Sequence, residues 1–210
     1  MEFLYSLAVL IGAYLLGCFN TAYFLGKKKK VDVFKEGSGN PGASNAMATM
    51  GWGAAVLVGL VDILKCTAAV VITRIIFQNN VELWFLASLG AIMGHMFPFY
   101  LKFKGGKGLA CLVGAYLALD WRAFIVAGLL IIVLTLVTDY IVISTFTLAL
   151  LFPVYSYFYS DARMGSIVAS IAAAALTGTL IFWKHRINIK RLIKGEEIGL
   201  RSANSGKHRK

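Results

Sequence analysis

Long runs of apolar residues alternate with short polar segments along the chain, and this pattern predicts an integral membrane protein. The apolar runs cover residues 3–26, 52–77, 82–101, 109–119, 122–138, 140–159 and 165–183. A helix needs roughly 20 apolar residues to cross the hydrocarbon core of a bilayer. The fourth run is shorter than this, so it predicts a broken or re-entrant helix, which suggests an internal cavity. We therefore expect an all-α fold with about seven transmembrane helices.

Two of these runs contain residues that disturb an apolar helix. Pro98, near the end of the third run, predicts a kink because proline cannot donate a backbone hydrogen bond. Asp62 and Lys65, inside the second run, are three residues apart and therefore share one helix face. Ionisable side chains are costly at membrane depth, so the pair marks either a functional site or a buried ion pair. The sequence leaves both interpretations open.

The distribution of basic residues predicts the orientation in the membrane. With seven crossings and the N-terminus outside, four segments face the cytoplasm: 27–51, 102–108, 138–139 and 184–210. These segments contain 17 of the 21 lysines and arginines, as expected from the excess of positive charge in cytoplasmic loops. The C-terminus is then cytoplasmic. Of the other four basic residues, one lies within a span and three lie near the outer side: Lys65, Arg74, Arg122 and Arg163.

Composition narrows the class of protein and of partner. Of the 210 residues, 59% are hydrophobic, whereas soluble domains average roughly 45–50%. Because no room is left for a separate soluble domain, we expect residues 1–210 to form one transmembrane domain. The net charge of +11 lies beside apolar spans, which favours anionic membrane lipids and phosphorylated substrates over nucleic acid. The three cysteines lie inside spans without metal-ligand spacing, so neither a metal site nor a disulfide framework is expected.

The polar stretch at residues 94–108, between the third and fourth runs, is the most unusual segment. It combines His95, Lys104 and Lys107 with the adjacent Gly105 and Gly106. Glycines let backbone N–H groups approach a ligand closely, and neighbouring lysines supply charge for an anion, most often phosphate. A loop that only sets topology needs no glycine cluster. We therefore expect an anion site here, with His95 either structural or acting as a proton carrier or hydrogen-bond donor.

A second polar segment, residues 38–51, is rich in small and turn-forming residues and predicts a structured loop. Ser38, Asn40 and Asn45 offer neutral hydrogen-bonding groups that suit phosphate oxygens or the hydroxyls of a polyol. Many turns have this composition, so the segment alone does not indicate a binding site. Its predicted position on the cytoplasmic side, together with the lysine–glycine stretch, is what favours substrate binding.

The third polar segment follows the last apolar run. His185 and Asn188 are three residues apart and share a helix face, so Asn188 can hold a substrate or orient the imidazole. Gly195 predicts the end of this helix, which lets Glu197 fold back toward the site. Arg191 can serve either a phosphate or the lipid surface. A basic anchor beside the membrane is the alternative interpretation of this segment.

The residue types present favour substrate positioning over covalent catalysis. The sequence has no Ser-His-Asp constellation, metal-ligand cluster, Walker loop or dinucleotide fingerprint. Transfer of an acyl group from an activated donor to an alcohol requires mainly that two substrates are held together and that developing charge is stabilised. The three polar segments therefore predict a membrane enzyme that acts on phosphate-bearing substrates.

Taken together, the three segments resemble the bacterial acyl-phosphate:glycerol-3-phosphate acyltransferase family over the whole chain. The matching motifs are Gly37-Ser38-Gly39-Asn40 with Gly42-Ala43-Ser44-Asn45, Gly94-His95 with Phe97-Pro98 and Phe103-Lys104-Gly105-Gly106-Lys107-Gly108, and His185-Arg186 with Asn188-Ile189, Arg191-Leu192 and Glu197. The family also has a pair at the positions of Asp62 and Lys65.

This resemblance implies transfer of a fatty acyl group from acyl-phosphate to the sn-1 hydroxyl of glycerol-3-phosphate, giving lysophosphatidic acid at the cytoplasmic side of a bacterial cell membrane. It also implies that the reaction uses no cofactor, no metal and no acyl-enzyme intermediate. His185 and Asn188 are implied at the reacting hydroxyl. The implied substrate-binding residues are Ser38, Asn40, Asn45, His95, Lys104, Gly105, Gly106, Lys107, Arg191 and Glu197.

The chain departs from the family pattern at three positions. Ala48 stands where the family usually has arginine, Val142 where it usually has serine, and Cys111 where it usually has threonine. Two alternatives stay open, and Ala48 and Val142 are the features that favour the first of them. One is a divergent paralogue that acylates another phosphorylated acceptor, or that binds or transports a phosphorylated lipid without catalysis. The other is a membrane scaffold with a basic cytoplasmic face.

Overall fold

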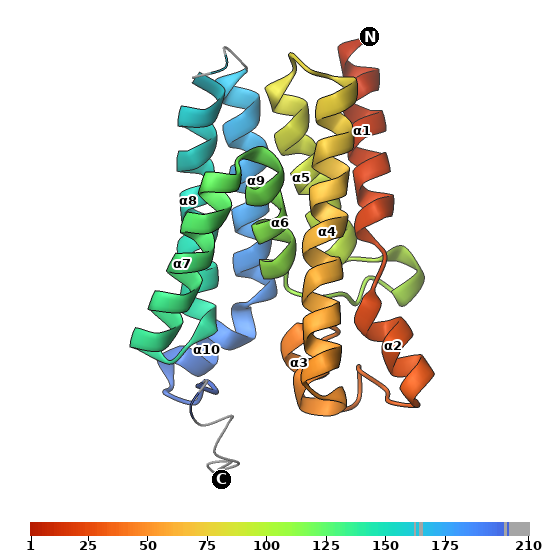
Figure 1. The fold of residues 1–210 in the computed structure, drawn as a ribbon, viewed down its shortest axis with the longest axis vertical. Helices are drawn as coiled ribbons and strands as arrows, with labels where there is room; N and C mark the ends of the chain where they lie inside the picture. The colour runs from red at the N-terminus through yellow and green to blue at the C-terminus, as the bar shows by residue number, and fades with distance from the viewer. Residues whose placement is uncertain (162, 164–165, 200, 202–210) are drawn as a thin grey trace.

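The computed structural model describes residues 1–161, 163, 166–199 and 201. Within these residues the regular structure is helical, and no strand is formed. The helices follow one another along the chain (Figure 1): α1 (Glu2–Gly17), α2 (Thr21–Lys29), α3 (Ala43–Met50), α4 (Trp52–Ile76), α5 (Val81–Met96), η1 (Phe99–Leu101), α6 (Leu109–Leu119), α7 (Trp121–Thr138), α8 (Ile141–Asp161), α9 (Ile167–Lys184) and α10 (Arg186–Ile193).

Six helical segments of the described chain are long and apolar enough to cross a membrane, counting α1 with α2 and α5 with η1 as one segment each. The remaining predicted span is α6, which has only 11 residues, as the short fourth apolar run indicated. The all-α membrane fold is therefore confirmed. The count of seven crossings and the orientation of the termini stay predictions.

The first predicted span is not one continuous helix, because it breaks between α1 and α2. Asn20 adopts an extended conformation, and its side-chain oxygen accepts a hydrogen bond from the N–H of Tyr23, which starts α2. Partners elsewhere in the fold satisfy the carbonyls freed by the break: Tyr100 donates to Cys18, and Lys65 donates to Phe19. Such pairing is what makes irregular backbone tolerable at membrane depth.

The predicted kink at Pro98 is wrong, because α5 ends at Met96 before the proline is reached. The residue before a proline is pushed out of the α region, so a helix commonly ends there. A short η1 turn follows, and then Lys102 and Phe103 both adopt left-handed backbone conformations. Such conformations are unfavourable for non-glycine residues and persist only where the surroundings enforce them. The lysine–glycine loop therefore has a defined backbone conformation that its surroundings enforce.

The structured loop predicted for residues 38–51 also needs correction, since its second half is the helix α3. Gly42 is the N-cap of α3, and Gly51, with φ of +89°, separates α3 from α4. That positive φ is unfavourable for residues with a Cβ, which explains why glycine stands at the junction. The polar segment is therefore a turn followed by two helical turns.

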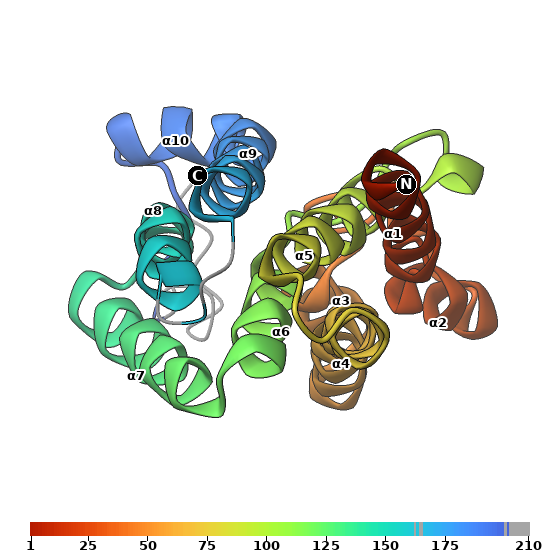
Figure 2. The ribbon, with the colours of Figure 1, turned by 90° about the horizontal axis from the view of Figure 1, so that it is seen from above.

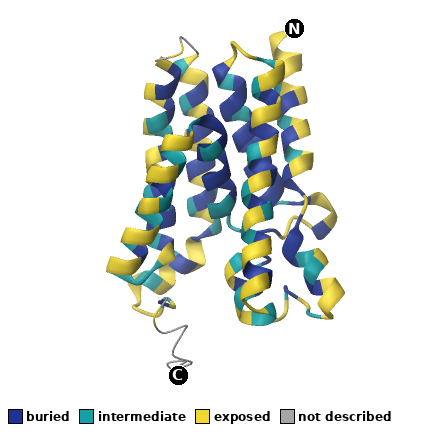
Figure 3. Cartoon of the chain, viewed as in Figure 1, coloured by how far each residue is buried: buried dark blue, intermediate teal, exposed yellow. Residues whose placement is uncertain are grey.

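The core lies along α5 and α6, which pack between α1 and α4 on one side and α8 and α9 on the other (Figure 2). Phe85, Ile92 and Leu112 are fully buried there. By contrast, α1 and α7 present many exposed apolar side chains, visible as exposed segments in Figure 3. Apolar outer faces of this kind suit a lipid environment. The central helices thus support the polar loops that follow α5 and α9.

Candidate functional site

The three polar segments gather in the lower half of Figure 1, away from the N-terminus of α1. The α2–α3 segment, the loop after η1 and α10 all lie there. Hydrogen bonds join the second segment directly to the third. Those of the first segment connect it to α2 and to its own loop instead.

A chain of hydrogen bonds links the lysine–glycine loop to α10. Lys107 Nζ donates to Asn188 Oδ1 at 2.6 Å, and Asn188 Nδ2 donates to Glu197 Oε1 at 2.7 Å. Glu197 reaches Asn188 because Gly195, with φ of +69°, turns the chain back after α10. The predicted folding back of Glu197 is therefore confirmed. The other carboxylate oxygen of Glu197 is buried and has no partner among the described residues.

His185 lies at the junction of α9 and α10, where it is 5% exposed. Its Nδ1 is 2.9 Å from the carbonyl oxygen of Ile181, and Phe146 packs edge-on against its ring. Because a carbonyl only accepts, this contact places the proton on Nδ1 and leaves Nε2 as an acceptor. The pKa of His185 is lowered to about 4, mainly by burial and also by the nearby positive charge of Lys107, while the hydrogen bond with Ile181 opposes this shift. The imidazole is therefore neutral at neutral pH.

Lys107 is the cation of this hydrogen-bonded chain, and its charge acts on His185. Burial lowers the pKa of Lys107, the carboxylate of Glu197 raises it, and the positive charge of Arg191 lowers it. His185, Lys107, Asn188, Arg191 and Glu197 therefore influence one another electrostatically or by direct contact. Sequence spacing gave no sign of Phe146 or of the Ile181 carbonyl, which fix the imidazole.

The backbone N–H groups of the two adjacent loop glycines bond to the end of α5. The N–H of Gly105 donates to the carbonyl of Met96, and the N–H of Gly106 donates to the carbonyl of His95, each at 3.1 Å. A Cβ on Gly106 would collide with the His95 imidazole. These two N–H groups are therefore used within the protein, and contact of the loop with an anion stays a prediction. Both glycines thus pack closely against the C-terminal end of α5 and provide hydrogen bonds to its last carbonyl groups.

His95 joins the predicted Asp62–Lys65 pair in one buried cluster. Lys65 Nζ lies 2.7 Å from Asp62 Oδ1 and 3.0 Å from His95 Nδ1, and it donates to the carbonyl of Phe19 at 2.7 Å. The side chains of Asp62 and Lys65 are 4% and 6% exposed. Of the two interpretations left open by the sequence, the structure shows the buried ion pair.

Cys111 also contacts this cluster, and its thiol donates to the backbone carbonyl of Asp62 at 3.3 Å. Asp62, His95 and Cys111 bring potential metal-ligand atoms within 4.8 Å of one another. The ammonium group of Lys65 already occupies the position between Asp62 and His95, and like charges repel, so the donor set does not fit a metal cation.

Asn45 organises the turn that precedes α3. Its Oδ1 accepts from the N–H of Ser38 at 2.7 Å, and its Nδ2 donates to the carbonyls of Val33 and Glu36. Three of the four hydrogen-bonding positions of the buried Asn45 amide are thus used by nearby backbone. The side chains of Ser38 and Asn40 form no hydrogen bond with another described residue. Contact of these three residues with a substrate stays a prediction.

Lys104 and Arg191 are exposed, and the structure shows no ion pair between either side chain and a described residue. Both therefore carry charge that remains available at this end of the molecule. Ala48 is also exposed, on α3, so the position at which the resemblance implies an arginine faces outward. Val142 is buried in α8, where it makes no polar contact.

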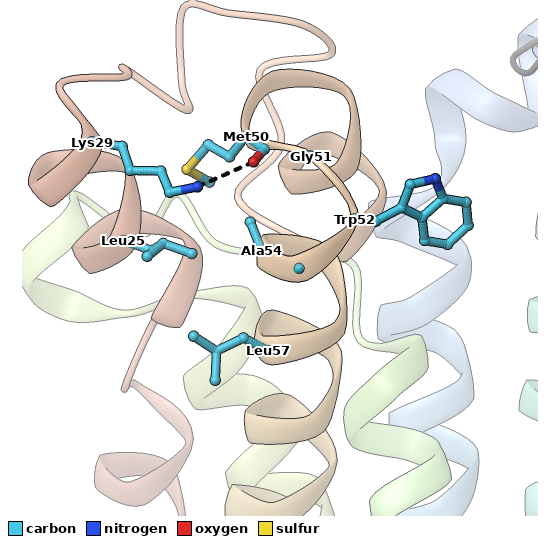
Figure 4. Close-up of a pocket in the computed structure, with 8 residues that line it drawn as sticks. Leu25, Lys29, Met50, Gly51, Trp52, Ala54 and Leu57 are labelled. Atoms are coloured by element: carbon cyan, nitrogen blue, oxygen red, sulfur yellow. Dashed lines mark hydrogen bonds between the residues drawn. The ribbon is translucent and has the colours of Figure 1, made fainter.

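A pocket of about 250 Å³ lies at the same end, between α2 and the start of α4 (Figure 4). Its lining is mostly apolar and includes Leu25, Met50 and Leu57. Lys29 reaches across it and donates to the carbonyl of Met50 at 3.2 Å, near the end of α3. None of the predicted site residues lines this pocket. It therefore adds no group to the network around His185.

Comparison with known proteins identifies the family. A family model described as glycerol-3-phosphate acyltransferase matches residues 7–195. The chain is 33% identical to glycerol-3-phosphate acyltransferase 1 of Oceanobacillus iheyensis over 205 residues, which cover 94% of this chain and 96% of the relative. It is 39% identical to the glycerol-3-phosphate acyltransferase of Halalkalibacterium halodurans, covering 90% and 92% of the two chains.

Solved structures give the same result. The fold is similar to the crystal structure of PlsY (YgiH), an integral membrane glycerol 3-phosphate acyltransferase, in its glycerol 3-phosphate form. The TM-score is 0.83, with 29% identity over 97% of this chain and 99% of the other. For the lysophosphatidic acid form the TM-score is 0.79, with 30% identity over 92% and 94% of the two chains. The chain belongs to the glycerol-3-phosphate acyltransferase family.

Proposed function

We propose that this protein transfers a fatty acyl group from an acyl-phosphate to the sn-1 hydroxyl of glycerol-3-phosphate, giving lysophosphatidic acid at the cytoplasmic side of the bacterial cell membrane. The observation that carries this proposal is the neutral, buried His185 beside the hydrogen-bonded chain from Lys107 to Glu197. The named relatives support the acceptor. So do the PlsY structures, which are glycerol 3-phosphate and lysophosphatidic acid forms.

His185 is the group best suited to the acceptor hydroxyl. The hydroxyl oxygen attacks the acyl carbonyl carbon, the ester bond forms, and the bond from the acyl carbon to the phosphate oxygen breaks. The hydroxyl proton passes either to Nε2 of His185 or to the departing phosphate. In the first case the contact between Nδ1 and the Ile181 carbonyl keeps the imidazole in the accepting tautomer.

Lys107 provides the fixed positive charge of this site, and Asn188 sets its distance from Glu197. Partial burial strengthens the attraction of Lys107 for a phosphate because fewer water molecules screen its charge. Lys104 and Arg191 supply further cations at the rim. We retain Ser38, Asn40, Asn45, His95, Gly105 and Gly106 as positions that shape the substrate-binding surface, with Glu197 as a partner for substrate hydroxyls.

The kind of residues around His185 supports an activated acyl donor such as an acyl-phosphate. The described residues near it include no serine or cysteine arranged as a nucleophile, so the donor itself must carry the activation. A mixed anhydride of a fatty acid and phosphate does so. Its phosphate leaving group also suits Lys107, whose charge stabilises the departing anion.

Turnover by the purified protein in detergent tests the proposal directly. With palmitoyl-phosphate and labelled glycerol-3-phosphate we expect labelled lysophosphatidic acid, and with palmitoyl-coenzyme A in place of palmitoyl-phosphate we expect none. Equal turnover with both donors would overturn the donor assignment. Absence of product from folded protein would direct attention to Ala48 and to other phosphorylated polyols as acceptors.

The His185→Ala variant tests the role of the imidazole. Loss of a positioned proton acceptor typically lowers turnover by about 10²–10⁴-fold. We expect a loss of this size with folding preserved, as judged by size-exclusion chromatography and circular dichroism. Ile193→Ala is the matched control, because Ile193 is 82% exposed at the end of the neighbouring α10 and should retain turnover. Unchanged turnover in His185→Ala would remove His185 from the site.

A further inference from the structure

We propose that the protein has a second anion site, which binds a phosphate group, at the end of the molecule opposite His185. Where α6 passes into α7, a pocket of about 400 Å³ is lined by Arg74, Arg122 and Arg163 together with Asp120. This region lies in the upper half of Figure 1, whereas α3 and α10 lie at the lower end. The site is independent of the proposed acyl transfer.

The three arginines come from distant parts of the sequence. Arg74 is in the last turn of α4, Arg122 is in the first turn of α7, and Arg163 follows α8. They are the three basic residues that the charge distribution leaves on the outer side of the predicted topology. Outer segments are generally poor in lysine and arginine. Convergence of all three on one pocket therefore indicates a local requirement for positive charge.

Part of this charge has a structural role, and part of it does not. Arg74 donates to the carbonyls of Ala118 and Leu119, so it caps the C-terminus of α6. The guanidinium of Arg163 lies 3.7 Å from the ring centre of Tyr159, and its Nη1 donates to the Tyr159 carbonyl at 3.5 Å, which leaves its other N–H donors available. Arg122 lies 5.6 Å from the ring centre of Trp121, and its side chain makes no hydrogen bond to a described residue. The guanidinium groups of Arg122 and Arg163 thus keep donors available.

The acidic residue of the pocket does not neutralise them. Asp120 is the N-cap of α7, and its carboxylate accepts from the N–H of Arg122 at 2.9 Å. No ion pair joins Asp120 to any of the three guanidinium groups in the described part of the chain, so the arginines outnumber the acid at this pocket. The N-terminal end of α7 adds a partial positive charge. An anion is therefore the expected ligand.

The geometry favours a phosphate among possible anions. Guanidinium groups form paired hydrogen bonds with phosphate oxygens, and stacking on an aromatic ring holds them ready. Below the pocket, the apolar side chains of Ile125, Val126 and Leu129 are exposed along α7. A phospholipid can place its phosphate at the arginines and its chains along this face. A free phosphate or soluble phosphate ester offers the same chemistry without the chains.

The test compares two double variants of the purified full-length protein. Arg122→Gln with Arg163→Gln removes two charges from the pocket and leaves the α6 cap by Arg74 intact. Lys27→Gln with Lys28→Gln removes two exposed charges from α2 at the opposite end. The melting temperature of each is titrated with a short-chain phosphatidylglycerol, with the matching diacylglycerol and with inorganic phosphate. A ligand that binds the folded state raises this temperature by mass action.

We expect at least one phosphate-bearing probe to stabilise the α2 variant like the unaltered protein, with an apparent Kd at least tenfold weaker in the arginine variant. Because the site around His185 also attracts phosphate, the informative quantity is this difference between the double variants. Stabilisation by phosphatidylglycerol alone assigns a lipid headgroup, and stabilisation also by inorganic phosphate assigns a free phosphate. Equal Kd values in both variants would overturn the proposal. So would stabilisation by diacylglycerol equal to that by phosphatidylglycerol.

The single variant Arg122→Gln serves as a second test if the double arginine variant does not fold. The Arg122 side chain is exposed and makes no hydrogen bond to a described residue, so its replacement should not disturb the fold. Losing one charge-assisted contact should weaken binding by about tenfold. An unchanged Kd in this folded variant would also overturn the proposal.

Discussion

Two clusters of charged and polar side chains differ in how many partners the protein itself provides for the lysine at their centre. In the cluster of Asp62, Lys65 and His95, the three protons of the lysine ammonium each have an acceptor nearby: Asp62, His95 and the carbonyl of Phe19. All three side chains are buried. This closed cluster holds the break after α1 against α4 and α5, and it leaves no donor on Lys65 for a ligand.

The cluster of Lys107, His185, Asn188 and Glu197 remains open. One carboxylate oxygen of Glu197 has no partner among the described residues, Nε2 of His185 is an available acceptor, and Lys107 makes one hydrogen bond through its ammonium group. Comparison of the two clusters therefore separates the charges that support the fold from those suited to a substrate.

Breaking the closed cluster should produce the largest effect on stability. Asp62→Asn preserves the shape of the side chain but leaves Lys65 as a buried cation without its counter-charge. Removing one partner of a buried pair costs about 3–5 kcal/mol, whereas an exposed pair contributes about 0–1 kcal/mol. The control is Asp32→Asn, which breaks the exposed pair with Lys35. Denaturant unfolding in detergent measures both, and equal losses would show that the closed cluster is not a structural support.

The pH dependence of stability should report on the open cluster. Burial lowers the pKa of His185 from 6.5 to about 4 in the folded protein. Between these values the unfolded chain binds a proton that the folded chain does not, so stability falls as the pH drops from 6.5 to 4. The pKa difference corresponds to roughly 3 kcal/mol.

The variant His185→Gln isolates this contribution, because all other ionisable side chains are the same in both proteins. We expect the free energy of unfolding to decline less steeply below pH 6.5 in the variant than in the unaltered protein. Parallel curves for the two proteins would mean that His185 is not buried as a neutral imidazole.

Sequence patterns predicted the parts of the fold that depend on local spacing. Apolar runs and their lengths gave the membrane helices and the short α6, and the spacing of three residues gave the pair of Asp62 and Lys65. The break before α2 was missed, because its stability depends on donors from Tyr100 and Lys65 far along the chain. Helical periodicity carries no information on such distant partners.

The same limit applied to the candidate site. The charge pattern placed Lys107 and Asn188 on one side of the membrane, but nothing in the sequence indicated that residues 81 positions apart form a hydrogen bond. The glycines were expected to allow close approach of a ligand, and the structure shows the His95 imidazole in close contact with Gly106. Composition thus identified a tightly packed loop without identifying its partner.

The smallest expected effect comes from adding a cation at the end of the molecule that carries the open cluster. Ala48 is exposed on α3, and glycerol-3-phosphate carries a phosphate that an arginine there can bind. A charge-assisted contact contributes about 1.5–3 kcal/mol, so Ala48→Arg should lower KM for glycerol-3-phosphate by about tenfold or more.

Turnover should change little in Ala48→Arg, because uniform binding of substrate and transition state lowers KM without raising kcat. Ala48→Gln is the control for side-chain size, and it should leave KM near that of the unaltered protein. If Ala48→Arg leaves KM unchanged, the acceptor phosphate does not reach α3. Recognition of the phosphate would then rest on Lys107, Lys104 and Arg191, and the open cluster would extend from the lysine–glycine loop to α10 without including the turn before α3.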